Sequence, residues 1–107
     1  MRQIDGRYGG VALTGTLYEP GDDPPDYEGA PTPETPFVWV CDAIRPVESG
    51  GVVQSIDGRD VRVTFERPAP RGFEDRGVAI DAAFDHLRDQ FARLDVDTDA
   101  VTVTVDP

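Results

Sequence analysis

Several kinds of residue and pattern are missing or scarce in this chain. It contains no lysine and no asparagine, and its ten basic residues are all arginine. The single cysteine, Cys41, excludes an internal disulfide and a zinc site built from several cysteines. No apolar run reaches the roughly 18 residues that a membrane-spanning helix requires. The first residues also lack the apolar stretch of a signal peptide, so we expect a cytoplasmic protein with no membrane partner.

Acidic residues dominate the charged set. The 107 residues include 21 acids against 10 arginines, and the formal net charge is −11. Aspartate outnumbers glutamate by fifteen to six. At about 1 M salt the Debye length falls to roughly 3 Å, which almost abolishes repulsion among surface carboxylates. The composition resembles that of proteins from halophiles that accumulate salt, and GC-rich coding is a second cause of the missing lysine and asparagine.

Motifs that signal a cofactor are absent as well. The sequence has no Walker loop, no dinucleotide fingerprint and no nucleophile elbow, so we predict no cofactor. An acidic surface disfavours nucleic acid as a partner, although salt adaptation weakens this argument by making acidity a general property. The partners that fit better are an unknown protein or a small anionic ligand.

Alternating apolar residues predict several β-strands. Residues 11–18 alternate apolar and polar side chains, as in a half-buried strand, and residues 37–41 are apolar on both faces. Residues 52–56 and 61–65 flank Asp57-Gly58, a dipeptide that favours a tight hairpin because both residues tolerate positive φ. These four segments supply most of the predicted sheet.

A single amphipathic helix is predicted near the C-terminus. Its apolar stripe has three- and four-residue spacing and consists of Ile80, Ala83, Phe84, Leu87, Phe91 and Leu94. Valine then alternates with threonine over residues 101–105, which predicts a last strand. We therefore expect one α+β domain over residues 1–107, with a single mainly antiparallel sheet of about five strands packed against this helix.

Residues 19–36 interrupt this pattern. They contain six prolines and six acids around Tyr27. Because proline removes backbone donors and carboxylates resist burial, we predict a long surface loop.

Cys41 and His86 are the only pair that could form a nucleophile and its base. Acyl transfer requires the two side chains to lie within hydrogen-bonding distance of each other. However, Cys41 falls in an apolar strand, where a thiol is usually inert, and His86 lies off the apolar stripe of the helix. The pattern favours two unrelated structural residues, and the catalytic residues stay unknown.

Three acids follow the predicted helix. Asp95, Asp97 and Asp99 present hard oxygen ligands of the kind that calcium or magnesium prefers, and Asp106 falls at the last position of a twelve-residue calcium loop. Ala100 replaces the glycine that such a loop requires, and an Asp-rich chain produces clusters by chance. A solvated turn is therefore favoured over a metal site.

A neutral arginine-bearing segment contrasts with the acidic remainder. Residues 57–76 contain five arginines and five acids, so the rest of the chain carries the whole negative charge. Arg67, Arg71 and Arg76 lie in a loop that leads into the helix, whose free N–H groups attract anions. These three arginines form the candidate site for an anionic ligand or partner. The alternative is that they pair with Glu66, Glu74 and Asp75 and only fix the loop in place.

Two classes of function remain open. The favoured one is a small accessory or binding protein that contacts an anion or a partner through the arginine-bearing loop or an exposed strand edge. The other is a small enzyme or ligand-binding domain that holds an anionic substrate at residues 67–76, with residues 19–36 as a lid. No complete catalytic constellation is visible, which favours the first class.

Overall fold

The computed structural model describes residues 1–22 and 32–106. In chain order its elements are β1 (Arg2–Tyr8), β2 (Val11–Tyr18), β3 (Phe37–Val40), β4 (Ala43–Pro46), β5 (Val52–Ile56), β6 (Arg59–Glu66), β7 (Arg71–Phe73), α1 (Arg76–Ala92), the short 3₁₀ helix η1 (Thr98–Ala100) and β8 (Thr102–Asp106). This content confirms the α+β class.

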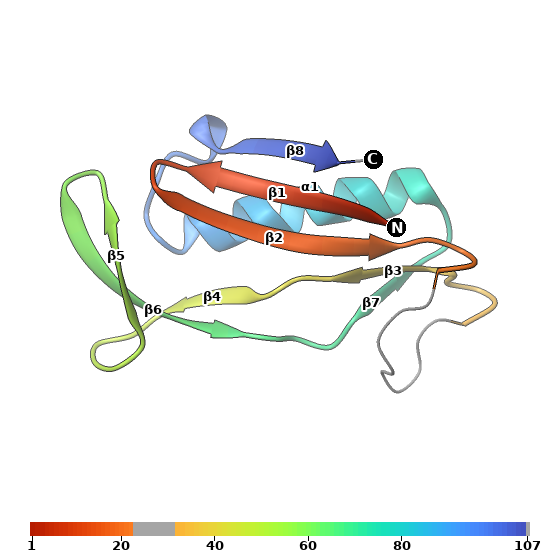
Figure 1. The fold of residues 1–107 in the computed structure, drawn as a ribbon, viewed down its shortest axis with the longest axis horizontal. Helices are drawn as coiled ribbons and strands as arrows, with labels where there is room; N and C mark the ends of the chain where they lie inside the picture. The colour runs from red at the N-terminus through yellow and green to blue at the C-terminus, as the bar shows by residue number, and fades with distance from the viewer. Residues whose placement is uncertain (23–31, 107) are drawn as a thin grey trace.

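The strands form two antiparallel sheets, so the expectation of one sheet is wrong. Five strands have the order β7-β3-β2-β1-β8, and a three-stranded sheet has the order β4-β6-β5 (Figure 1). β3 leads into β4, and β6 leads into β7. The residues that connect them, 41–42 and 67–70, do not pair with each other, so the two antiparallel pairs are separate. Pro68 and Pro70 cannot donate backbone hydrogen bonds there, which gives a physical reason for the break. The second sheet is therefore free to turn away from the first.

Three strands, β1, β4 and β7, have no clear signal in the sequence. Asp5 and Gly6 interrupt the alternation of β1, yet the strand pairs along its length with β2 and also with β8. A Cβ atom at Gly6 would lie 3.1 Å from Cε2 of Phe91, so glycine permits the helix to approach the sheet closely.

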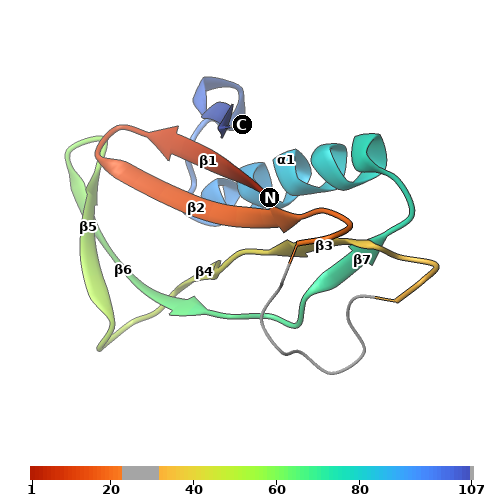
Figure 2. The same cartoon turned by 45° about the vertical axis from the view of Figure 1, so that its right-hand side comes forward.

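The predicted helix is confirmed and begins earlier than its apolar stripe. Asp75 caps its N-terminus by accepting a hydrogen bond from the Val78 N–H at 2.9 Å. Leu87 and Phe91 have no exposed surface, and the helix packs along one face of the five-stranded sheet (Figures 1 and 2). The core lies between α1 and this face.

The predicted Asp-Gly hairpin is also confirmed. Asp57 and Gly58 have φ angles of 51° and 78°, and the flanking residues Ile56 and Arg59 pair directly. The hairpin turn reaches β1, because the Tyr8 hydroxyl donates to Asp57 Oδ2 at 2.8 Å. The three-stranded sheet thus lies at the end of the molecule where α1 terminates (Figure 2).

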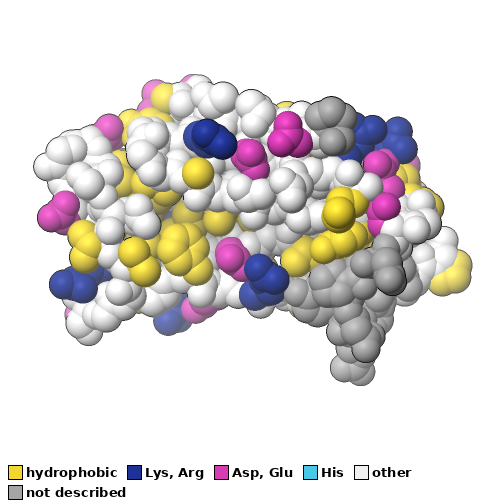
Figure 3. All heavy atoms as spheres, in the orientation of Figure 1, with side chains coloured by type: hydrophobic (Ala, Val, Ile, Leu, Met, Phe, Trp, Pro, Cys, Tyr) yellow, Lys and Arg dark blue, Asp and Glu magenta, His cyan; other side chains and the backbone are white. Residues whose placement is uncertain are grey.

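The face shown in Figure 3 has mostly uncharged atoms. Some charged side chains are scattered over it, and a group of arginine and acidic side chains lies at its right-hand end. Thr14, Thr16, Thr102 and Thr104 occupy the positions of β2 and β8 that alternate with the core-facing residues. Among the described residues, no helix is long and apolar enough to cross a membrane.

Candidate anion-binding site

One flank of α1 is joined to the chain segment that links β3 to β4. His86 Nε2–H donates to the Asp42 carbonyl at 3.4 Å, and Gln90 Oε1 accepts from the Ile44 N–H at 2.9 Å. Arg93 Nη1 donates to the Ile44 carbonyl at 3.1 Å. Because residues spaced by four and seven lie on the same side of a helix, the three side chains form a row. This row fixes the position of the helix flank against the sheet.

His86 lies in a half-buried position beside Trp39. The two rings meet edge to face, with centroids 6.2 Å apart and an interplanar angle of 75°. Burial lowers the pKa of His86, and the positive charges of Arg71 and Arg93 lower it further. The hydrogen bond to the Asp42 carbonyl and the charge of Asp89 act in the opposite direction. His86 is therefore predominantly neutral at pH 7.

Arg71 reaches this site from β7. It pairs with Trp39 in the register of β3 and β7, so the two side chains lie on the same face of the sheet. Its guanidinium carbon lies 5.5 Å from the ring centroid of Phe73. In the part of the chain that the structure describes, neither Arg71 nor Arg93 forms an ion pair with a carboxylate. Both guanidinium groups can therefore serve an external anion.

The other two predicted arginines have internal partners. Arg67 Nε donates to Asp42 Oδ1 at 3.0 Å, at the border of the site. Arg76 forms an ion pair with Glu19, which also binds Arg2 at 3.3 Å. The structure thus leaves Arg71 beside His86 but directs Arg76 to Glu19.

Two of the three acids that were expected to pair with these arginines, Glu66 and Asp75, have other contacts. Glu66 pairs with Arg45 at 3.2 Å, and Asp75 caps the helix. Ion pairing of the arginines does occur, but Asp42 and Glu19, which are distant in sequence, supply the carboxylates. Partners of this kind cannot be identified from local charge patterns.

Comparison with known proteins gives a family but no activity. The model of a family of unknown function, DUF7113, matches residues 1–107. The chain belongs to this family. No curated protein and no solved structure is significantly similar to it. The function of this DUF7113 member therefore has to be argued from its own residues.

Cys41 is unsuited to nucleophilic chemistry in this DUF7113 member. Its side chain is buried, and burial, together with the nearby Asp42 charge, raises its pKa to about 12. At neutral pH the group is a thiol, whereas a nucleophile requires the thiolate. Although both residues are described, no hydrogen bond joins Cys41 to His86.

The three acids after the helix are close in sequence but do not converge. Asp95 has a φ of 60° and a side chain that is 95% exposed, 4.0 Å from Arg59. Asp97 instead accepts a hydrogen bond from the Asp99 N–H at 3.0 Å and caps η1. Within residues 1–22 and 32–106, no group of three His, Cys, Asp or Glu residues is arranged to hold a metal. Cation binding here stays a prediction.

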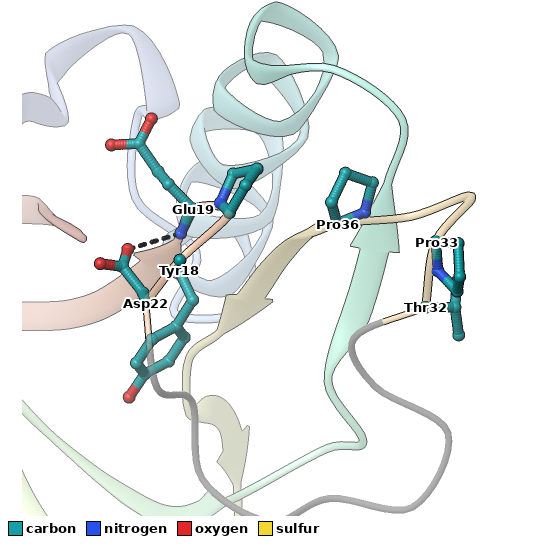
Figure 4. Close-up of a pocket in the computed structure, with 8 residues that line it drawn as sticks. Tyr18, Glu19, Asp22, Thr32, Pro33 and Pro36 are labelled. Carbon is teal, nitrogen blue, oxygen red and sulfur yellow. Dashed lines mark hydrogen bonds between the residues drawn. The ribbon is translucent and has the colours of Figure 1, made fainter.

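A pocket of about 350 Å³ lies where β2 ends and β3 begins, within the predicted loop (Figure 4). It is lined by Tyr18, Glu19, Pro20, Gly21, Asp22, Thr32, Pro33 and Pro36. Glu19 already binds two arginines, and Asp22 binds the Met1 amino group at 2.6 Å. Residues 23–31, including Tyr27, lie outside the described residues, so the predicted exposure of that part of the loop stays a prediction. The pocket carboxylates are neutralised from within, which leaves the His86 site as the stronger candidate.

Sequence reasoning missed two of the residues that build this site. Gln90 and Arg93 lie on the same helix flank as His86, and their spacing of four and seven residues is visible in the sequence. That spacing could have indicated a polar row beside the apolar stripe. Its partner, the backbone of residues 42–44, becomes evident only when the sheet is folded.

Proposed function

We propose that this protein is a small accessory or binding protein that holds an anionic group of a ligand or partner between Arg71, His86 and Arg93. The carrying observation is that Arg71, paired in register with the Trp39 that contacts His86, and Arg93, on the same helix flank as His86, have no carboxylate partner among the described residues. In a chain with 21 acids and 10 arginines, internal partners for these two groups would be easy to provide. Arginine suits the role because its planar fork binds oxyanions in a bidentate manner.

The composition supports a salt-rich cytoplasm as the place where this protein works. A net charge of −11 without lysine is tolerated best where salt screens the carboxylates. In such a medium a general acidic surface does not repel an anionic partner over long distances. Short-range contacts with Arg71 and Arg93 then decide what binds.

A small enzyme acting on an anionic substrate is the second candidate. His86 could serve as a base, because its Nδ1 has no hydrogen-bond partner among the described residues. The Cys41 thiol is buried, and no other nucleophile is hydrogen-bonded to the ring in that part of the chain. The binding function is therefore better supported.

Chemical-shift mapping tests the binding function. Isotope-labelled protein in molar KCl is titrated with an adenine nucleotide, an RNA oligomer and a polyglutamate peptide, and perturbed amides are mapped onto the fold. We expect at least one of them to perturb residues around Arg71, His86 and Arg93, and Arg71→Gln to abolish that response. Perturbations confined to another surface, or no response to any of the three, would contradict the proposal.

Arg88→Gln is the matched control. Arg88 lies on the opposite flank of α1, with its guanidinium carbon 5.7 Å from the Phe84 ring centroid, and it also lacks an ion pair in the described part of the chain. This variant also removes one arginine charge, but from α1 on the side away from His86, and it should bind as the wild type does. Equal losses in both variants would indicate a general charge effect.

A further inference from the structure

The two ring nitrogens of His86 have different surroundings. Nε2 faces the Asp42 carbonyl at 3.4 Å, and because a carbonyl can only accept, Nε2 carries the hydrogen. The neutral ring therefore keeps its lone pair on Nδ1. Among the described residues Nδ1 has no hydrogen-bond partner. A proton that enters the ring must bind at Nδ1.

The charged groups around the ring come from three elements. β7 supplies Arg71, and α1 supplies Arg93 and Asp89. The segment after β3 supplies Asp42, whose carbonyl contacts the ring and whose carboxylate pairs with Arg67. Arg71 and Arg93 oppose a third positive charge on His86 as long as no anion lies between them.

We infer that this site takes a doubly charged oxyanion of the phosphate type and that a proton enters His86 at Nδ1 as the anion binds. The inference rests on the proposed function, because it names the ligand class and the regulation of the same site. A single carboxylate would neutralise one of the two guanidinium groups and leave the other uncompensated. A tetrahedral dianion neutralises both and still offers an acceptor oxygen to the protonated ring.

Proton uptake follows from the same charges. Once a dianion offsets Arg71 and Arg93, the main electrostatic opposition to imidazolium is removed, and the negative charge of the ligand stabilises it. Binding is then stronger at low pH, where the proton is available. Each unit by which the ligand raises the pKa of His86 corresponds to about a tenfold gain in affinity, which is complete at a pH below the pKa of His86 in the free protein.

The chain is well suited to a direct test, because His86 is its only histidine. Its ring resonances can be followed by NMR from pH 5 to pH 8 without further assignment. Sulfate is the probe, since it stays doubly charged over this range, and acetate at equal ionic strength is the singly charged control. In KCl alone we expect a pKa below 6.5, because burial and the arginines lower it.

The expected result with sulfate is an upward shift of the His86 pKa, together with roughly tenfold tighter binding at pH 5.5 than at pH 7.5. His86→Gln should make sulfate binding independent of pH, Arg71→Gln should abolish binding, and Arg88→Gln should change neither. Sulfate binding that leaves the pKa unmoved would overturn proton uptake but not the binding function. An equal response to acetate would overturn the ligand class. No response to either anion would overturn this inference, whereas the binding function is decided by the nucleotide, RNA and peptide titrations.

Discussion

Gln90 is buried at 3% exposure and makes two hydrogen bonds that link α1 to the sheet and to its own previous turn. Its Oε1 accepts from the Ile44 N–H at 2.9 Å, and its Nε2 donates to the His86 carbonyl at 3.3 Å. A buried amide of this kind contributes position as well as stability, because only one orientation satisfies both contacts. Gln90 therefore fixes the position of α1 along the segment between β3 and β4, so that His86 and Arg93 reach the carbonyl groups of Asp42 and Ile44.

Replacing Gln90 by leucine should destabilise the fold. The Ile44 N–H would lose its acceptor, and a buried unsatisfied donor costs about 1–3 kcal/mol. Urea unfolding in molar KCl measures the change in the free energy of unfolding. Gln3→Leu is the control, since Gln3 is exposed on β1 and should change this free energy by less than about 0.5 kcal/mol. Similar losses in both variants would show that the Gln90 hydrogen bonds contribute little.

The end of α1 shows how one element depends on another. The helix has no basic residue in its last turn, so its own side chains do not offset the negative end of its dipole. Arg59, at the start of β6, instead donates from Nη2 to the Leu94 carbonyl at 3.0 Å and to the Asp95 carbonyl at 3.1 Å. The three-stranded sheet thus caps the chain that leaves the helix.

Arg59→Gln should therefore lower the melting temperature, by an amount that corresponds to about 1–2 kcal/mol for two hydrogen bonds from a charged donor. Asp95→Asn is the matched control, because asparagine tolerates the φ of 60° and removes only the carboxylate. The Asp95 side chain is 95% exposed, so its ion pair with Arg59 should contribute little. Thermal melts of both variants separate the hydrogen bonds of Arg59 to the two carbonyls from its ion pair with Asp95. A larger decrease in melting temperature for Asp95→Asn than for Arg59→Gln would show that the ion pair contributes more than these hydrogen bonds.

Secondary structure was predictable where the periodicity was long and regular. The helix stripe around Leu87 and Phe91, the hairpin at Asp57-Gly58 and the alternating strands all carry that signal. β7 lies instead in a segment with the composition of a loop, and its three residues are extended because β3 pairs with them. Only part of the candidate site could be predicted. The sequence indicated Arg71 as a candidate, but the pairing of β7 with β3 brought it next to Trp39, whose ring contacts His86.

At the scale of the whole molecule, we expect the excess of carboxylates to make the free energy of unfolding depend on salt. The described ion pairs involve only some of the 21 acids, and the exposed face of α1 carries Asp81, Asp85 and Asp89 without partners in the described part of the chain. Below about 0.1 M salt the Debye length exceeds roughly 10 Å, so these charges repel one another across the surface. Folding should therefore depend on salt.

Thermal melts in a KCl series test this dependence. The melting temperature should rise from about 0.05 M to about 2 M KCl as repulsion is screened. Replacing Asp81, Asp85 and Asp89 together by asparagine removes three negative charges from one face and should flatten this rise. A melting temperature that is the same at low and molar KCl would contradict the proposed adaptation to salt.

The sequence by itself determined the α+β class, the helix stripe, the hairpin turn and the acidic balance, because each depends on residue type and on spacing over a few positions. Only the tertiary structure decided that there are two sheets, that Arg76 binds Glu19, and that Arg71 pairs in register with Trp39, whose ring contacts His86. These features depend on which segments become neighbours across long stretches of chain. Gly15 illustrates the reason: a Cβ atom there would lie too close to the Trp39 ring, a contact between strands that local sequence does not encode.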